Sequence, residues 1–184
     1  MSSLDTTDVI DEMLSKNGEF ADAHDVSALT LMPTRRAIIL SCVDPRVDPA
    51  IVLGAQLGDA AVIRNIGGRI TPATLRTLAL LATIARSNGA QPGAGWQLIV
   101  VHHTDCGISQ LADHPDLLAA ELGTTPDALD RQTLTDPRAS LDADLSALHT
   151  NPLLPRGLTV SGLLYDTTTG RLETVIAPSA LGAP

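Results

Sequence analysis

The stretch of sequence that decides the fold covers residues 37–46 and reads Ala37-Ile38-Ile39-Leu40-Ser41-Cys42-Val43-Asp44-Pro45-Arg46. Its first four residues are apolar, and a run of this length is typical of a strand buried on both faces of a parallel sheet. We expect the strand to end at Cys42, so that Asp44 and Arg46 follow directly after it. In open α/β sheets, ligands bind beyond the carboxyl ends of the strands. The stretch therefore predicts a central strand and one part of a site.

Two more apolar runs have the length of buried strands, at residues 60–63 and 96–101. The later run leads directly to His103 and Cys106. Because the carboxyl ends of parallel strands meet at one edge of a sheet, we expect these two side chains to lie near Cys42, although they are far from it in the sequence.

Helix signals separate the runs. A capping residue followed by proline, as in Asp48-Pro49, Thr71-Pro72 and Asp136-Pro137, is typical of a helix start. We expect helices over residues 5–17 (ending at Gly18), from 49 to near 54, from 72 to 88 and from 137 to about 149, with further starts at Pro115 and Pro126.

The C-terminal part has the pattern of a β-hairpin, with strands over residues 158–165 and 171–176 around a turn at 166–170. The order of elements predicts an α/β fold, with a central, mainly parallel sheet flanked by helices and a C-terminal antiparallel hairpin or edge strand. No linker or repeat divides the chain, so we expect a single domain over residues 1–184.

The composition excludes several classes of partner. The formal net charge is −9 and the isoelectric point is near 4.7, which argues against nucleic acid or an anionic membrane as a partner. No apolar stretch is long enough to span a bilayer, and the start lacks the pattern of a secretory signal. We therefore expect a cytoplasmic protein, in which two cysteines are more often metal ligands or reactive thiols than a disulfide.

Cys42, His103 and Cys106 together offer two thiolates and one imidazole. This is a ligand set typical of catalytic zinc, which takes three protein ligands and keeps a fourth position for water. We expect one zinc ion per chain, and we expect the zinc to lower the pKa of that water and so produce a hydroxide nucleophile. Two thiolates donate more charge to the zinc than three imidazoles would, so the pKa of the bound water should be lowered less. Activity should therefore rise toward alkaline pH.

Asp44 has two possible uses, which the residues leave open. It could act as a fourth zinc ligand and close the site. It could instead pair with Arg46 and accept a hydrogen bond from the zinc-bound hydroxide, since a guanidinium holds a carboxylate bidentately. Only the second state leaves room for a nucleophile.

Simpler interpretations remain for each of these residues. His103 could be a loop histidine that only makes hydrogen bonds. The cysteines could be inert and buried, or a redox pair, although no Cys-x-x-Cys is present. Asp44 and Arg46 could form an ordinary ion pair. His102 is expected to be structural, because alternation along a strand points it away from His103, and Asp105 is expected to be a turn residue that bonds its own backbone.

Three motifs carry a family resemblance: Cys-x-Asp-x-Arg at 42–46, Arg-Asn-x-Gly-Gly at 64–68 and His-x-x-Cys-Gly at 103–107. In this order and spacing they resemble the β-class carbonic anhydrases of the compact bacterial type. The resemblance implies a zinc lyase that reversibly hydrates carbon dioxide to bicarbonate and a proton, with an Asp44–Arg46 dyad. It also implies a homodimer or higher homo-oligomer, with the N-terminal helix packing on a partner subunit.

Two other functions fit the same residues. One is hydrolysis of carbon disulfide or carbonyl sulfide, which are also linear heteroallenes, on the same scaffold. The other is a non-catalytic zinc-binding protein. The Asp44–Arg46 pair argues against the second, because a closed structural site has four ligands and needs no dyad.

Overall fold

The computed structural model describes residues 6–182, without the side chains of residues 6 and 7. The chain divides into two compact units, Met1–Leu31 and Met32–Pro184. The larger unit contains every described strand. The expectation of one domain over residues 1–184 stays a prediction.

The smaller unit contains one helix, α1 (Thr6–Ala23). The predicted helix end at Gly18 was wrong, since the helix continues for five residues beyond it, and residue 5 of the predicted range lies outside the described residues. A lone glycine costs a helix only about 1 kcal/mol relative to alanine, which is too little to end it here. Along α1, the side chains of Ile10, Met13 and Leu14 are exposed.

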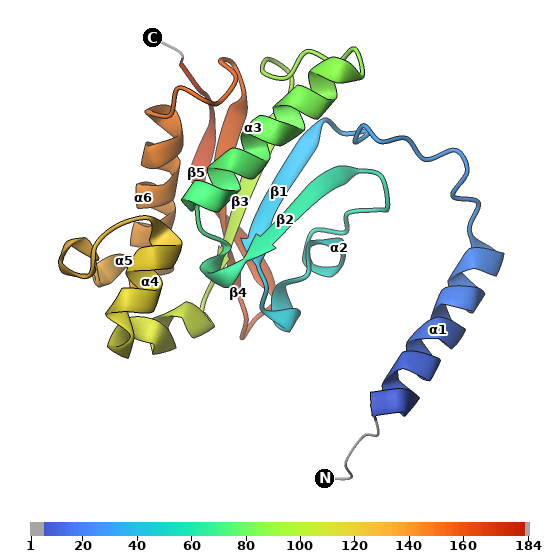
Figure 1. The fold of residues 1–184 in the computed structure, drawn as a ribbon, viewed down its shortest axis with the longest axis horizontal. Coiled ribbons are helices and arrows are strands. Elements are labelled where there is room, and N and C mark those ends of the chain that lie inside the picture. Colours follow the sequence, from blue (N-terminus) through green and yellow to red (C-terminus); the bar gives the residue numbers. More distant parts are fainter. Residues whose placement is uncertain (1–5, 183–184) are drawn as a thin grey trace. The chain divides into compact units, whose positions relative to one another are not determined.

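The larger unit is built on one five-stranded sheet (Figure 1). Its strands are β1 (Ala37–Cys42), β2 (Ala60–Asn65), β3 (Gln97–His103), β4 (Thr159–Asp166) and β5 (Arg171–Ala180). The spatial order is β2-β1-β3-β4-β5, with β5 antiparallel to β4 and all other pairs parallel. This confirms the predicted α/β fold, its mainly parallel sheet and its C-terminal hairpin.

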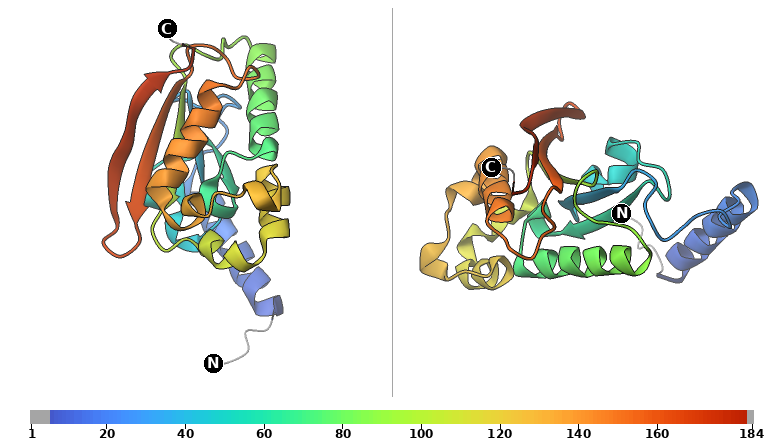
Figure 2. Two further views of the ribbon diagram at one scale, coloured as in Figure 1. Left: turned by 90° about the vertical axis from the view of Figure 1, so that its left-hand side faces the viewer. Right: turned by 90° about the horizontal axis from the view of Figure 1, so that it is seen from above.

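The main core lies between one face of the sheet and two helices, α3 (Pro72–Ser87) and α6 (Pro137–His149), as Figure 2 shows. Alternate residues of the central strands point into it, because side chains along a strand alternate between the two faces. The strand residues buried in this core are Ile38, Leu40, Leu98, Val100, Val160 and Leu164. All six residues of β1 are buried, as expected for a strand covered on both faces.

The capping signals placed three helices correctly. Asp48 caps α2 (Pro49–Val52), Thr71 caps α3 and Asp136 caps α6, each through a side-chain oxygen that accepts a backbone N–H. Pro115 begins α4 (Pro115–Leu122). Pro126 opens only a three-residue 3₁₀ turn, and the short α5 (Gln132–Thr135) was not predicted.

A second, smaller core lies after β3 and contains Ile108, Leu118 and Leu134, with Cys106 packed against it. It anchors the segment that follows β3, which contains a 3₁₀ helix (Gly107–Asp113), α4 and α5. No helix among the described residues is long and apolar enough to cross a membrane.

Candidate metal centre

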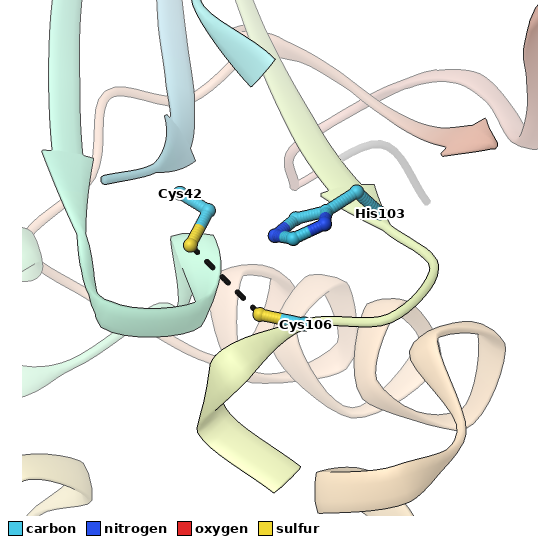
Figure 3. Close-up of side chains that lie close together, drawn as sticks. All are labelled: Cys42, His103 and Cys106. Atoms are coloured by element: carbon cyan, nitrogen blue, oxygen red, sulfur yellow. Dashed lines mark hydrogen bonds between the residues drawn. The ribbon is translucent and has the colours of Figure 1, made fainter. Parts of the chain in front are cut away.

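Cys42, His103 and Cys106 meet at the carboxyl edge of the sheet, as their sequence positions predicted (Figure 3). Cys42 is the last residue of β1, His103 is the last residue of β3, and Cys106 lies three residues further along. One potential ligand atom from each lies within 4.8 Å of the others. Among the described residues, no other group of His, Cys, Asp and Glu meets this condition.

Two observations test whether these atoms fit a zinc ion. The two sulfurs are 3.8 Å apart, and two Zn–S bonds of ~2.3 Å at a tetrahedral angle would separate them by about 3.8 Å. His103 Nε2 is buried without a hydrogen-bond partner, and it is the one such side-chain N or O atom in the described part of the chain. An unpaired buried nitrogen is costly unless it binds something. The three residues therefore fit the ion.

The other ring nitrogen of His103 explains this orientation. Nδ1 lies 2.9 Å from the carbonyl oxygen of Thr104. A carbonyl only accepts, so Nδ1 carries the proton and Nε2 keeps its lone pair for a metal.

Backbone groups lie close to Cys42. The Asp44 backbone N–H donates a hydrogen bond to the Cys42 sulfur, with an N–S distance of 3.4 Å. Gly68, at φ +66°, passes so close that an added Cβ would come within 3.0 Å of the Cys42 nitrogen. Gly68 thus allows a close approach of the backbone to Cys42 that a residue with a side chain would prevent.

The two sulfurs are close enough for one thiol proton to form a hydrogen bond between them. A hydrogen bond from Cys106 lowers the pKa of Cys42 and raises that of Cys106. Burial lowers the pKa of His103, but contacts with Cys42, the Thr104 backbone and the Asp44 charge together outweigh burial, so the net change is upward. A divalent cation would replace this proton and stabilise both thiolates.

Asp44 is paired with Arg46, beside the cluster and outside the set of close ligand atoms. Its carboxylate accepts hydrogen bonds from the Arg46 backbone N–H (2.9 Å), Nε (3.0 Å) and Nη2 (2.7 Å). These bonds lower the pKa of Asp44 to about 2. The carboxylate is therefore ionised and can act only as an acceptor at neutral pH.

Arg46 also binds the segment that follows β3. The sequence did not reveal this contact. Its Nη1 donates to the Asp105 carboxylate (2.8 Å) and its Nη2 to the Asp105 carbonyl oxygen (3.0 Å). Asp105 has φ +54°, a rare conformation for a residue with a side chain. The structure thus corrects the expectation that Asp105 bonds its own backbone: its side chain contacts Arg46 across the site.

Arg64 performs a similar task for the segment after β1. Its Nε donates to the Cys42 carbonyl oxygen (2.8 Å) and its Nη2 to that of Asp44 (2.7 Å), while Nη1 contacts the Asp48 carboxylate (2.8 Å). The sequence placed Arg64 in a motif without a role. Only its position at the end of the neighbouring strand could have suggested one.

His102 is structural, as predicted. It is buried, and its Nε2 lies 3.2 Å from the Gly68 carbonyl and 3.4 Å from the Asp144 carboxylate. Asp144 also binds Arg69 through two bonds, Nε–Oδ2 (2.9 Å) and Nη2–Oδ1 (3.1 Å), and all three side chains are buried. This network links α6 and β3 to the turn at Gly68 and Arg69 after β2.

A cavity of about 80 Å³ opens beside the cluster. Its lining includes His103, Cys106, Ile108 and Leu134. A cavity of this size suits a ligand of a few atoms rather than a large substrate.

Known proteins share this arrangement of elements. The sequence model of the family described as carbonic anhydrase matches residues 37–135. The crystal structure of carbonic anhydrase from Streptococcus mutans is similar, with a TM-score of 0.70, 33% sequence identity and coverage of 90% of this chain and 96% of that chain. Beta-carbonic anhydrase 1 of Mycobacterium tuberculosis is 28% identical over 91% of this chain and 98% of its own length. The carbon disulfide hydrolase of Acidithiobacillus thiooxidans is more distant, with 25% identity over 76% of each chain.

Proposed function

This chain belongs to the carbonic anhydrase family, and we propose that it reversibly hydrates carbon dioxide to bicarbonate and a proton. The observation that carries the proposal is the Cys42–His103–Cys106 cluster with the Asp44–Arg46 pair beside it. The three clustered residues would hold one zinc ion per chain. Bound zinc would lower the pKa of a water molecule toward 7 and so supply a nucleophile at neutral pH.

The protein's own residues would orient this reaction. Asp44, which is ionised, can accept a hydrogen bond from the attacking water and so direct a lone pair toward carbon dioxide. Arg46 holds Asp44 through a fork of two nitrogens, which fixes the carboxylate in position. Arg64 holds the backbone on which Asp44 lies.

Asp44 is also the residue through which the site could close. If it left Arg46 and became a fourth ligand, no position would remain for the attacking water. The fork of bonds from Arg46 supports the open state as the active one. Binding of zinc by two thiolates also predicts higher activity at alkaline pH, because charge donated by sulfur raises the pKa of the water.

A homodimer or larger homo-oligomer is part of this proposal. Apolar side chains are exposed around the edge strand β2 and the nearby α2, and they are Val43, Ile51, Leu57, Val62 and Ile66. A second copy of the chain could cover this surface, and α1 could pack on the partner. A cytoplasmic location agrees with two free thiols, which a reducing compartment preserves.

The test combines metal analysis with stopped-flow hydration of carbon dioxide from pH 6 to 9. We expect one zinc per chain and a rate that rises with pH. The same zinc-loaded sample should be assayed with carbon disulfide and carbonyl sulfide, because hydrolase relatives share the scaffold. Turnover of these alone would replace the proposal with heteroallene hydrolysis, and zinc binding without any turnover would indicate a non-catalytic protein.

A further inference from the structure

The carbonyl oxygen of Thr104 is the group that orients His103, and it has a second hydrogen-bond partner. Besides His103 Nδ1 at 2.9 Å, it faces Oγ1 of Thr167 at 3.3 Å. Thr167 lies in the turn between β4 and β5, 63 residues from Thr104 along the chain. A carbonyl oxygen has two lone pairs, so it can accept both bonds at once.

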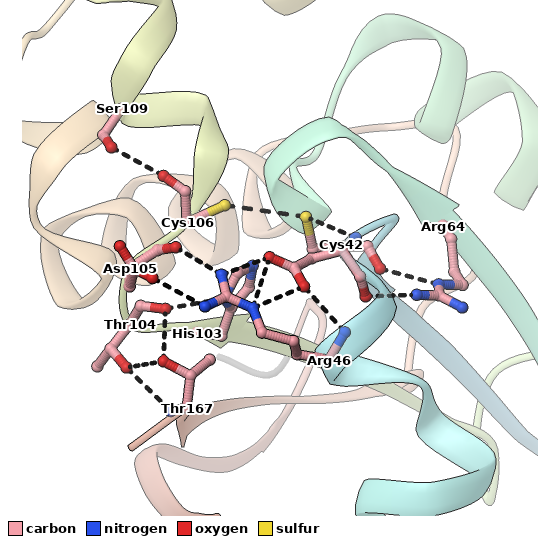
Figure 4. Close-up of polar contacts among 10 residues, drawn as sticks. Cys42, Arg46, Arg64, His103, Thr104, Asp105, Cys106, Ser109 and Thr167 are labelled. Atoms are coloured by element: carbon pink, nitrogen blue, oxygen red, sulfur yellow. Dashed lines mark hydrogen bonds and ion pairs between the residues drawn. The ribbon is translucent and has the colours of Figure 1, made fainter. Parts of the chain in front are cut away.

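The two threonines form a closed set of hydrogen bonds (Figure 4). The Thr167 backbone N–H donates to Thr104 Oγ1 (3.0 Å), and the two hydroxyl oxygens are 3.0 Å apart. One direction of protons satisfies every contact. Thr104 Oγ1–H donates to Thr167 Oγ1, and Thr167 Oγ1–H donates to the Thr104 carbonyl.

The backbone of Thr104 is tied to the same hairpin, since its N–H donates to the Tyr165 carbonyl oxygen (3.0 Å). Both peptide groups of Thr104 are thus fixed from β4 and from the turn after it. This leaves the carbonyl little freedom to rotate away from the imidazole.

We propose that Thr167 is a positioning residue for His103, acting through the Thr104 carbonyl to hold the ring with Nε2 directed at the metal. This inference rests on the proposed function in taking His103 as a zinc ligand. Outer partners of metal ligands generally affect metal affinity by about 10- to 100-fold. Thr167 is one hydrogen bond further from the metal than the Thr104 carbonyl, so we expect loss of its hydroxyl to weaken zinc binding by about 3- to 10-fold.

The experiment compares zinc affinity, measured by competition with a chelator, in four variants. Thr167→Val removes the hydroxyl with little change of shape, and Thr167→Ser keeps it. Thr104→Val removes the hydroxyl that orients the one on Thr167. Thr168→Val makes the same chemical change at the exposed neighbour in the turn and is the matched control. The ¹H and ¹⁵N resonances of the His103 ring are recorded for each zinc-loaded protein.

We expect weaker zinc binding and a shifted Nδ1–H resonance in Thr167→Val, a smaller change of the same kind in Thr104→Val, and wild-type behaviour in Thr167→Ser and Thr168→Val. Unchanged affinity in Thr167→Val would overturn the inference alone, as would equal losses in Thr167→Ser or Thr168→Val. If Thr167→Val did not fold, unchanged affinity in Thr104→Val would overturn it. A wild-type protein that binds no zinc would overturn the proposed function as well.

Discussion

The two segments that supply the cluster are held in different ways. The segment after β1 has local contacts, since Asp44 accepts from Arg46 two positions later and Asp48 caps the next helix, and it is also bound by Arg64 of the neighbouring strand β2. The segment after β3 depends on distant parts of the chain. Arg46 binds Asp105, and Thr167 binds Thr104.

This difference shows that one site is positioned by two kinds of contact, local and long-range. Contacts over two residues form readily and are visible in the sequence, because short side chains such as Asp bond nearby backbone. Contacts between residues 59 and 63 positions apart require the completed sheet, and they hold the end of β3 and the turn after it, which together carry two of the three proposed ligands. Mutations in the two segments should therefore affect zinc binding, activity and stability differently.

Cys106→Ala removes a proposed zinc ligand from the segment after β3 and should have the largest effect. With one thiolate and one imidazole left, we expect zinc content near zero and hydration slower by about 1000-fold or more, because the water loses its activation. Metal analysis and stopped-flow assays check this. Full zinc content in the variant would contradict the assignment of Cys106.

Asp144→Ala breaks the buried ion pair with Arg69, which links α6 to the turn after β2, and should act on stability. It leaves Arg69 buried without its partner, and such losses cost about 3–5 kcal/mol. The free energy of unfolding in urea measures this. Asp142→Ala, at an exposed position of the same helix, is the matched control and should change stability by less than about 0.5 kcal/mol.

Asp44→Asn tests the locally held segment. The amide keeps the shape but loses the charge, so zinc should remain bound while hydration falls by about 100-fold. Metal content and rate are measured on the same sample. Loss of zinc together with activity would instead make Asp44 a ligand in the resting state.

Asp144 should also affect how stability changes with pH. Burial raises its pKa, but bonds from His102 and Arg69 outweigh this and leave the pKa below the ordinary value of 3.8. A carboxyl whose pKa is lower in the folded state stabilises the fold above pH ~4, and this contribution is lost as the pH falls through the folded pKa. Between pH 5 and pH 3, wild type should therefore lose stability faster than Asp144→Asn. If the stability of the two proteins fell equally with pH, the lowered pKa of Asp144 in the folded state would be contradicted.

Asp105→Asn should give the smallest effect, because this side chain is 75% exposed and its ion pair with Arg46 is partly screened by water. The Asp105 carbonyl still binds Arg46, so we expect a two- to five-fold lower rate with zinc retained. Raising the salt concentration should reduce the difference from wild type. A loss as large as that of Asp44→Asn would show that the two segments act as one unit.

The sequence was sufficient for most of the fold. Four consecutive apolar residues at 37–40 predicted a strand buried on both faces, and Asp48, Thr71 and Asp136 marked helix starts, because these signals act within a few residues. The end of α1 was misplaced since the cost of Gly18 is small beside the continuing helix. The short α5 carries no comparable local signal.

For the site, the sequence by itself determined which residue types lie at the strand ends, and therefore that two thiols and an imidazole could meet. Only the tertiary structure decided that their sulfurs lie 3.8 Å apart, that Arg46 joins Asp44 to Asp105, and that Thr167 reaches Thr104. The physical reason is that a hydrogen bond depends on distance and angle between its atoms, whereas a sequence pattern reports only neighbours along the chain and the face on which they lie.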